Sequence, residues 1–197
     1  MSTRMQRLSF LLAAVVVAAL ALAGCGGGPT SDRTGQEGTS GAGFNDADVT
    51  FLQGMTAHHE EAVEMAELVP GRAAHPELMT FADQIIATQT AEIDQMMGLL
   101  EEAGEDAGAG HGGMDMEGMP GMSAQQMAEL EQLEGQQFDL TFLEMMTVHH
   151  MGANEMSRMV IDQGRNPVIQ ELAETIISAQ TAEIHQMRRW QRQWMAA

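Results

Sequence analysis

Two short segments of this sequence combine histidine and methionine in a pattern that could bind a soft metal ion. In each segment two adjacent histidines follow a methionine by three residues, and a second methionine stands six residues after the pair. Thioether sulfur is a soft, uncharged ligand that suits Cu(I), and imidazole binds copper in either oxidation state as well as zinc. Zinc gives no reason to enrich methionine, of which the chain has 19, so copper is favoured. The candidate ligands of the two segments are Met55, His58, His59, Met65, Met146, His149, His150 and Met156.

Two glutamates stand where an apolar residue is expected. Glu92 and Glu183 each share a helical stripe with an isoleucine, a glutamine and a methionine. A carboxylate facing a core needs a cation, an imidazolium or a hydrogen-bond donor. We therefore add Glu92, Met96, Glu183 and Met187 to the candidate metal ligands. The sequence leaves open the alternative that histidine and glutamate satisfy one another as a polar layer while methionine fills the core.

A glycine-rich loop carries a second kind of candidate site. Within twelve residues it holds four methionines and a histidine, together with two acidic residues that would attract cations. Such a loop cannot build a core, so core filling does not explain these methionines, although low-complexity drift remains an alternative. The candidate ligands of the loop are His111, Met114, Met116, Met119 and Met122.

Iron chemistry is less favoured than copper binding. A di-iron carboxylate bundle needs Glu-x-x-His pairs on facing helices, and none of the seven histidines has a glutamate three residues before it. We assign no catalytic residue and favour a role in binding over catalysis. Two alternatives stay open: a metal oxidase of ferritin-like type, and a metal-free bundle that serves as an interaction module of the cell envelope.

The two histidine segments belong to a duplicated unit. Residues 48–96, shifted by 91 positions, align without a gap on residues 139–187, and 23 of the 49 pairs are identical. Apolar periodicity predicts two helices in each unit, about 45–69 and 76–102 in the first. A proline begins the second helix of each unit, because the first helical turn needs no backbone N–H from that residue.

A helical hairpin cannot bury its apolar stripe alone. Two of them should therefore pack as an all-α, antiparallel four-helix bundle with pseudo-twofold symmetry. Ser123 and Gln126 form a capping-box pair that predicts a short additional helix between the units. The expected parts of the bundle, residues 44–197, are a first repeat at 44–102, the methionine-rich loop at 103–122, the short helix at 123–134 and a second repeat at 135–197.

The N-terminal part of the chain has the pattern of an export signal. Residues 1–24 combine two arginines with an apolar stretch too short to span a bilayer comfortably. The stretch ends in Leu22-Ala23-Gly24-Cys25, which resembles a bacterial lipobox. We expect Cys25 to be lipidated and residues 25–43 to be a flexible tether, with an ordinary secretory leader as the alternative. The protein would then be exported and anchored to the outer face of the bacterial cell membrane, or periplasmic.

The charge and the cysteine content of the chain exclude one class of partner and one kind of scaffold. The chain has 28 acidic and 9 basic residues and a net charge of −19, so phosphate backbones would repel it and nucleic-acid binding is excluded. A single cysteine excludes a disulfide scaffold. The expected partners are a metal ion and, through Cys25, the membrane. The sequence leaves open a homo-oligomer and a copper-handling partner.

The repeated segments resemble a known family. The Met-x-x-His-His-x-x-Ala-x-x-Met segments, the Phe138-Asp139-x-x-Phe142-Leu143 sequence and the Gln-x-x-Glu-Ile-x-x-Met segments are similar to domain-of-unknown-function family 305, over about residues 44–194. The resemblance implies a ferritin-like fold, export or lipid anchoring, and copper binding through the methionines and histidines of the two segments. The chain departs from an exact repeat where Asp94 is replaced by His185, so the two halves need not bind equally.

Overall fold

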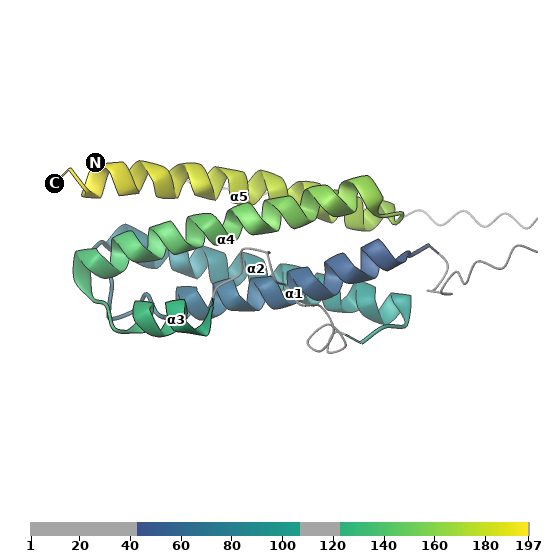
Figure 1. Ribbon diagram of the computed structural model, residues 1–197, viewed down its shortest axis with the longest axis horizontal. Helices are drawn as coiled ribbons and strands as arrows, with labels where there is room; N and C mark the ends of the chain where they lie inside the picture. The colour runs from purple at the N-terminus through teal and green to yellow at the C-terminus, as the bar shows by residue number, and fades with distance from the viewer. Residues whose placement is uncertain (1–42, 107–122, 197) are drawn as a thin grey trace, which may run out of the picture. The chain divides into compact units, whose positions relative to one another are not determined.

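The computed structural model describes residues 43–106 and 123–196, which fall in one compact unit, Glu37–Ala197. The described residues form five helices and no strand, so the predicted all-α class is confirmed (Figure 1). Within these residues no helix is both long enough and apolar enough to cross a membrane. The helices are α1 (Asp46–Glu67), α2 (Pro76–Ala103), α3 (Ala124–Glu131), α4 (Gly135–Gln163) and α5 (Pro167–Trp194).

Local sequence determines where these helices begin. Asn45 forms a capping box with Asp48 at the start of α1, and Ser123 forms the predicted one with Gln126 at α3. Pro76 and Pro167 occupy the first turn of α2 and α5.

Two helices end earlier than the sequence predicts, at Glu67 rather than about residue 69 and at Glu131 rather than residue 134. The two residues that follow α1 each donate their backbone N–H to a carbonyl three residues back. The two residues that follow α3 do the same. These tight turns end the α-helical hydrogen-bond pattern while the chain still follows its apolar stripe. Helix α1 therefore ends at Glu67 and α3 at Glu131.

The helices pair as two hairpins. Helix α1 packs against α2 and α4 against α5, and the hairpins meet where α1 lies against α4. Helices α2 and α5 approach one another less closely than these pairs do. The arrangement is compatible with the predicted four-helix bundle and places the two histidine segments, on α1 and α4, at the interface between the repeats.

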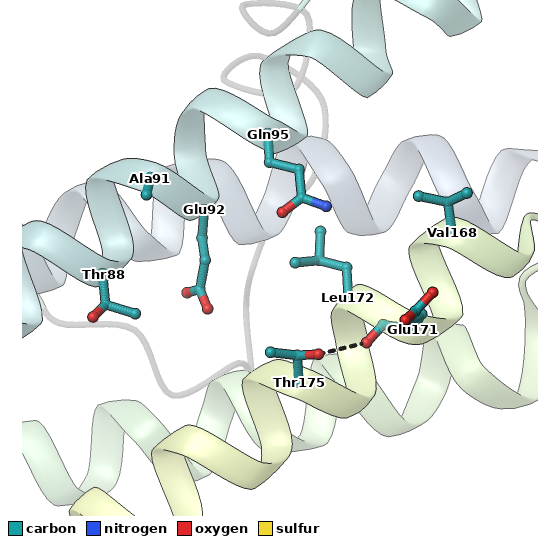
Figure 2. Close-up of a pocket in the computed structure, with 8 residues that line it drawn as sticks. All are labelled: Thr88, Ala91, Glu92, Gln95, Val168, Glu171, Leu172 and Thr175. Carbon is teal, nitrogen blue, oxygen red and sulfur yellow. Dashed lines mark hydrogen bonds between the residues drawn. The ribbon is translucent and has the colours of Figure 1, made fainter. Parts of the chain in front are cut away.

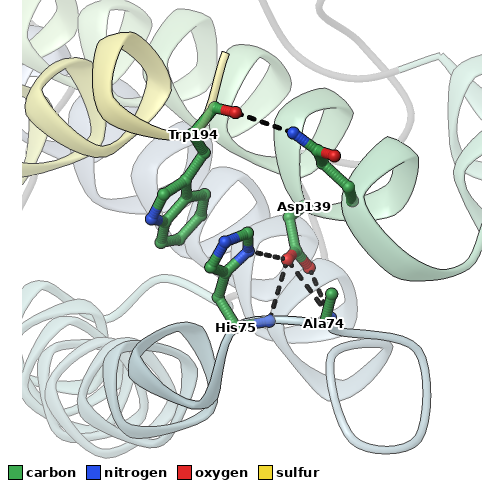
Figure 3. Close-up of polar contacts among 5 residues, drawn as sticks. Ala74, His75, Asp139 and Trp194 are labelled. Atoms are coloured by element: carbon green, nitrogen blue, oxygen red, sulfur yellow. Dashed lines mark hydrogen bonds and ion pairs between the residues drawn. The ribbon is translucent and has the colours of Figure 1, made fainter. Parts of the chain in front are cut away.

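Each repeat closes the turn of the other through a buried aspartate. Asp139, at the start of α4, accepts the backbone N–H groups of Ala74 and His75, at 3.2 and 3.0 Å, in the turn between α1 and α2 (Figure 3). Asp48, the equivalent residue of α1, accepts those of Arg165 and Asn166 in the turn between α4 and α5. Both aspartates are fully buried, so these bonds satisfy the carboxylates and the turns together.

The approach of Asp48 depends on a glycine. A Cβ at Gly164 would lie 2.5 Å from Asp48 Oδ1 and 2.5 Å from the carbonyl oxygen of Val160. Only a residue without a side chain leaves room for the carboxylate at this turn.

The apolar core is divided into two clusters, each with methionines from both repeats. We name them the first methionine cluster (Met55, Met96 and Met156) and the second methionine cluster (Met65, Met146 and Met187). A shift of 91 positions converts one set into the other, so the clusters obey the pseudo-twofold symmetry of the sequence. All six side chains are buried.

Candidate metal centre

Four buried imidazoles lie between the two methionine clusters. Along α1 the histidine pair stands between Met55, in the first cluster, and Met65, in the second. The equivalent rings of His58 and His149 have centroids 3.6 Å apart across the interface between α1 and α4, and the rings of His149 and His150 are 6.3 Å apart. We name this set, His58, His59, His149 and His150, the histidine layer; none of its members is more than 2% exposed.

Each candidate glutamate binds one histidine of its own repeat. Glu92 Oε2 lies 2.7 Å from His59 Nε2, and Glu183 Oε2 lies 2.7 Å from His150 Nε2. An ionised carboxylate only accepts hydrogen bonds, so Nε2 of each ring carries the hydrogen. In a neutral ring the other nitrogen, Nδ1, then presents a lone pair. Nδ1 of His59 and of His150 is buried and has no hydrogen-bond partner among the described residues.

These contacts indicate whether the residues present could hold a metal ion. The polar-layer alternative accounts for one nitrogen of His59 and of His150 and leaves the other unsatisfied, which is costly in a buried site. Histidines that bind metals commonly donate their second N–H to a carboxylate, which fixes the tautomer and the ring orientation. The two glutamate–histidine pairs have this arrangement, so the donor set fits a metal ion at Nδ1.

The histidine layer is not symmetrical in its charges. His149 Nε2 lies 3.6 Å from Glu61 Oε2, and the residue equivalent to Glu61 in the second repeat is Gly152. Burial lowers the pKa of His149 below the ordinary value of 6.5, and the Glu61 carboxylate offsets only part of that effect. His149 is therefore neutral at pH 7 and able to coordinate a metal.

The predicted methionine ligands are buried on both sides of this layer. One of the six sulfurs already has a polar contact, since Thr147 Oγ1 donates to Met187 Sδ at 3.8 Å. Within residues 43–106 and 123–196, no three side chains of His, Cys, Asp or Glu come together in a group that could hold a metal ion. Methionine is not one of these four residue types, so this statement does not cover a site that methionine sulfur completes.

Part of the predicted site lies outside the described residues. This part comprises the loop candidates His111, Met114, Met116, Met119 and Met122 and the lipidation candidate Cys25.

Sequence reasoning assigned no role to several polar residues that the structure places in the core. The Gln89 and Gln180 side chains are each 2% exposed, and their amide groups have no hydrogen-bond partner among the described residues. Each glutamine stands about one turn before the glutamate of its repeat, so a glutamine recurs on the apolar stripe of both copies. This recurrence is the sequence signal from which the burial of the two amides could have been predicted. Asn154, which replaces Val63 of the first repeat, is also buried and donates to Thr181 Oγ1.

Comparison with known proteins agrees with the all-α fold. The family model described as "Domain of unknown function (DUF305)" matches residues 48–191. A DUF305 fragment from Deinococcus radiodurans is 26% identical, with a TM-score of 0.70 over 77% of this chain and 99% of that one. A DUF305 protein from Streptomyces coelicolor, inferred to be secreted, is 28% identical, with a TM-score of 0.68 over 75% and 93%.

One solved relative carries metals. The Cu(II)-bound form of the protein CopM is 32% identical to this chain, with a TM-score of 0.66 over 75% of this chain and 97% of CopM. CopM has also been solved in Cu(I)-bound, silver-bound and metal-free forms. No functionally curated protein matches the sequence significantly.

Proposed function

This chain belongs to the DUF305 family, and from that premise we propose that it is an exported, lipid-anchored protein that binds copper, chiefly as Cu(I). It would buffer the ion or pass it to a partner. One observation carries the proposal: two buried imidazoles are held by carboxylates at Nε2, and their Nδ1 atoms have no hydrogen-bond partner among the described residues. The copper- and silver-bound forms of CopM support the same choice of metal.

The proposal divides the candidate residues by role. Nδ1 of His59 and of His150, together with the other two imidazoles of the histidine layer, provides nitrogen ligands. The two methionine clusters provide sulfur. Glu92 and Glu183 orient histidines and do not bind the metal themselves. This last assignment differs from the expectation that both glutamates are ligands, and the 2.7 Å contacts to Nε2 favour it.

The donor set favours a monovalent ion. Neutral imidazole and thioether groups bring no charge into the core, and the desolvation of an ion becomes more costly as its charge rises. A soft monovalent ion such as Cu(I) or Ag(I) therefore fits better than Zn²⁺ or Fe²⁺, which carry more charge and gain less from sulfur.

Native mass spectrometry of the full chain tests the binding proposal. The chain is mixed in turn with Cu(I), Cu(II), Zn²⁺ and Fe²⁺, and the mass gained gives the number of ions bound. We expect Cu(I) to be retained in preference to Zn²⁺, and the variant with His58, His59, His149 and His150 changed to Ala to lose core binding. Changing the exposed His185 to Ala is the matched control. Equal retention by the quadruple variant and the parent would refute a site in the histidine layer.

The membrane proposal has a separate test. Changing Cys25 to Ser removes the thiol that a lipid would modify, so the variant should be released from the membrane fraction while the parent stays bound. Mass spectrometry of the purified parent should show the added mass of the lipid. An unmodified parent that is released to the same extent would contradict anchoring and leave the metal proposal intact.

A further inference from the structure

Two clefts lie between α2 and α5, which approach one another less closely than the helices of either hairpin do. We name them the Glu92 cleft, of about 610 Å³, and the Glu183 cleft, of about 580 Å³. Most of their lining residues are equivalent under the shift of 91 positions, so they are two copies of one feature. Figure 2 shows Glu92 extending from α2 into the first cleft, opposite Glu171 and Leu172 on α5.

Each cleft is lined by a glutamate that contacts one histidine of the histidine layer. The Glu92 side chain is 12% exposed and that of Glu183 is 21% exposed, whereas the imidazoles that they bind are fully buried. On the α1–α4 side the tilted rings of His58 and His149 lie in contact, with centroids 3.6 Å apart, and the partly exposed Glu61 carboxylate lies 3.6 Å from His149 Nε2. On the α2–α5 side the carboxylates of Glu92 and Glu183 line clefts that open to solvent.

The two clefts differ in charge. The Glu92 cleft is lined by two carboxylates, Glu92 and Glu171, and by no basic residue. The Glu183 cleft has two carboxylates as well, but Arg189 also lines it and donates a hydrogen bond to Gln186 within it. A cation is attracted by the first cleft and meets a fixed positive charge at the second.

We propose that metal cations enter the histidine layer through the Glu92 cleft, where the negative charges of Glu92 and Glu171 attract the incoming ion. This inference rests on the proposed metal binding and adds a route to it. Glu171 acts on the rate of entry and not on the final affinity, because it lies on the exposed surface of α5. Its effect decreases as salt screens the charge.

The rate of copper uptake tests the route. The full chain is mixed in a stopped-flow instrument with Cu(I) held by a weak, coloured chelator, and the loss of colour gives the rate and the amount transferred. For Glu171→Gln we expect uptake about threefold slower at low ionic strength, the effect of one charge acting through water over about 7 Å. The amount transferred should not change. The matched control is Glu77→Gln, which removes the same charge at the Glu183 cleft and should leave the rate unchanged.

A second pair of variants tests the route by steric blocking. Thr175 and Gln84 are exposed, equivalent residues, each lining one of the clefts. Thr175→Trp should slow uptake and Gln84→Trp should not. Equal rates within both pairs of variants would overturn the route and leave copper binding in place. An unmodified chain that takes up no Cu(I) would overturn the proposed function as well.

Discussion

The clearest test of the metal centre is the substitution Glu92→Gln. The change keeps the size of the side chain and removes the ionised acceptor that holds His59 Nε2 at 2.7 Å. A glutamine amide can accept from Nε2 or donate to it. When it donates, the hydrogen moves to Nδ1 and the proposed metal ligand is lost. The substitution therefore makes the correct tautomer of His59 less favoured without emptying the site.

The expected magnitude follows from this geometry. Loss of the carboxylate that orients a metal-bound histidine lowers metal affinity about 10- to 100-fold, or roughly 1.4–2.8 kcal/mol. The metal-free chain should lose about 1–2 kcal/mol of stability, the difference between a hydrogen bond to a charged group and one between neutral groups. The 12% exposure of Glu92 leaves little solvent screening to reduce that difference.

Competition for Cu(I) against a coloured chelator measures the affinity, and X-ray absorption at the copper edge measures the coordination sphere. The matched control is Glu101→Gln, an exposed glutamate on the same helix α2. We expect Glu92→Gln to weaken binding with the same nitrogen and sulfur ligands, and the control to change neither quantity. Loss of an oxygen ligand in Glu92→Gln would show that the glutamate binds the metal directly, and unchanged affinity would refute the orienting role.

Three other outcomes follow from the structure. Asp139→Ala leaves two backbone N–H groups without their acceptor, so it should cost about 2–4 kcal/mol, read from the urea midpoint, whereas Asp83→Ala on the exposed side of α2 should cost less than about 0.5 kcal/mol. The pKa of His149 is lowered by burial, so the unfolded chain takes up its proton first as the pH falls below 6.5. The melting temperature of the metal-free chain should therefore fall between pH 7 and pH 5 and fall less in His149→Phe; a parallel decline would contradict this. A peptide of residues 108–123 should bind Cu(I) in preference to Zn²⁺ in a titration, and no preference would remove the loop from the proposal.

The starts of the helices could be predicted from the sequence because they depend on nearby residues. Proline in the first turn, the Ser123 capping box and apolar residues at helical spacing act within a few positions of one another. The same spacing places each histidine pair beside the apolar stripe of its helix, and in the structure all four rings are buried. Both copies show the proline and the apolar spacing, as expected of a duplicated unit.

Contacts between the repeats could not be predicted in this way. The partner of Asp139 is a turn 64 residues away, and the ring opposite His58 belongs to the other repeat. Periodicity shows which face of a helix is buried and not what covers it. For Glu92 the sequence indicated the need for a cation or a hydrogen-bond donor, and only the folded chain identifies that group as the ring of His59.

The composition of the methionine clusters has a consequence for the origin of the protein. Each cluster takes two methionines from one repeat and one from the other, so an isolated repeat completes neither. A single-repeat ancestor would have had to pair with another copy of itself, at a strength limited by its concentration. Joining both copies in one polypeptide makes that pairing intramolecular. It also allows matched positions to diverge, as His75 and Asn166 have done, which an exact homodimer could not.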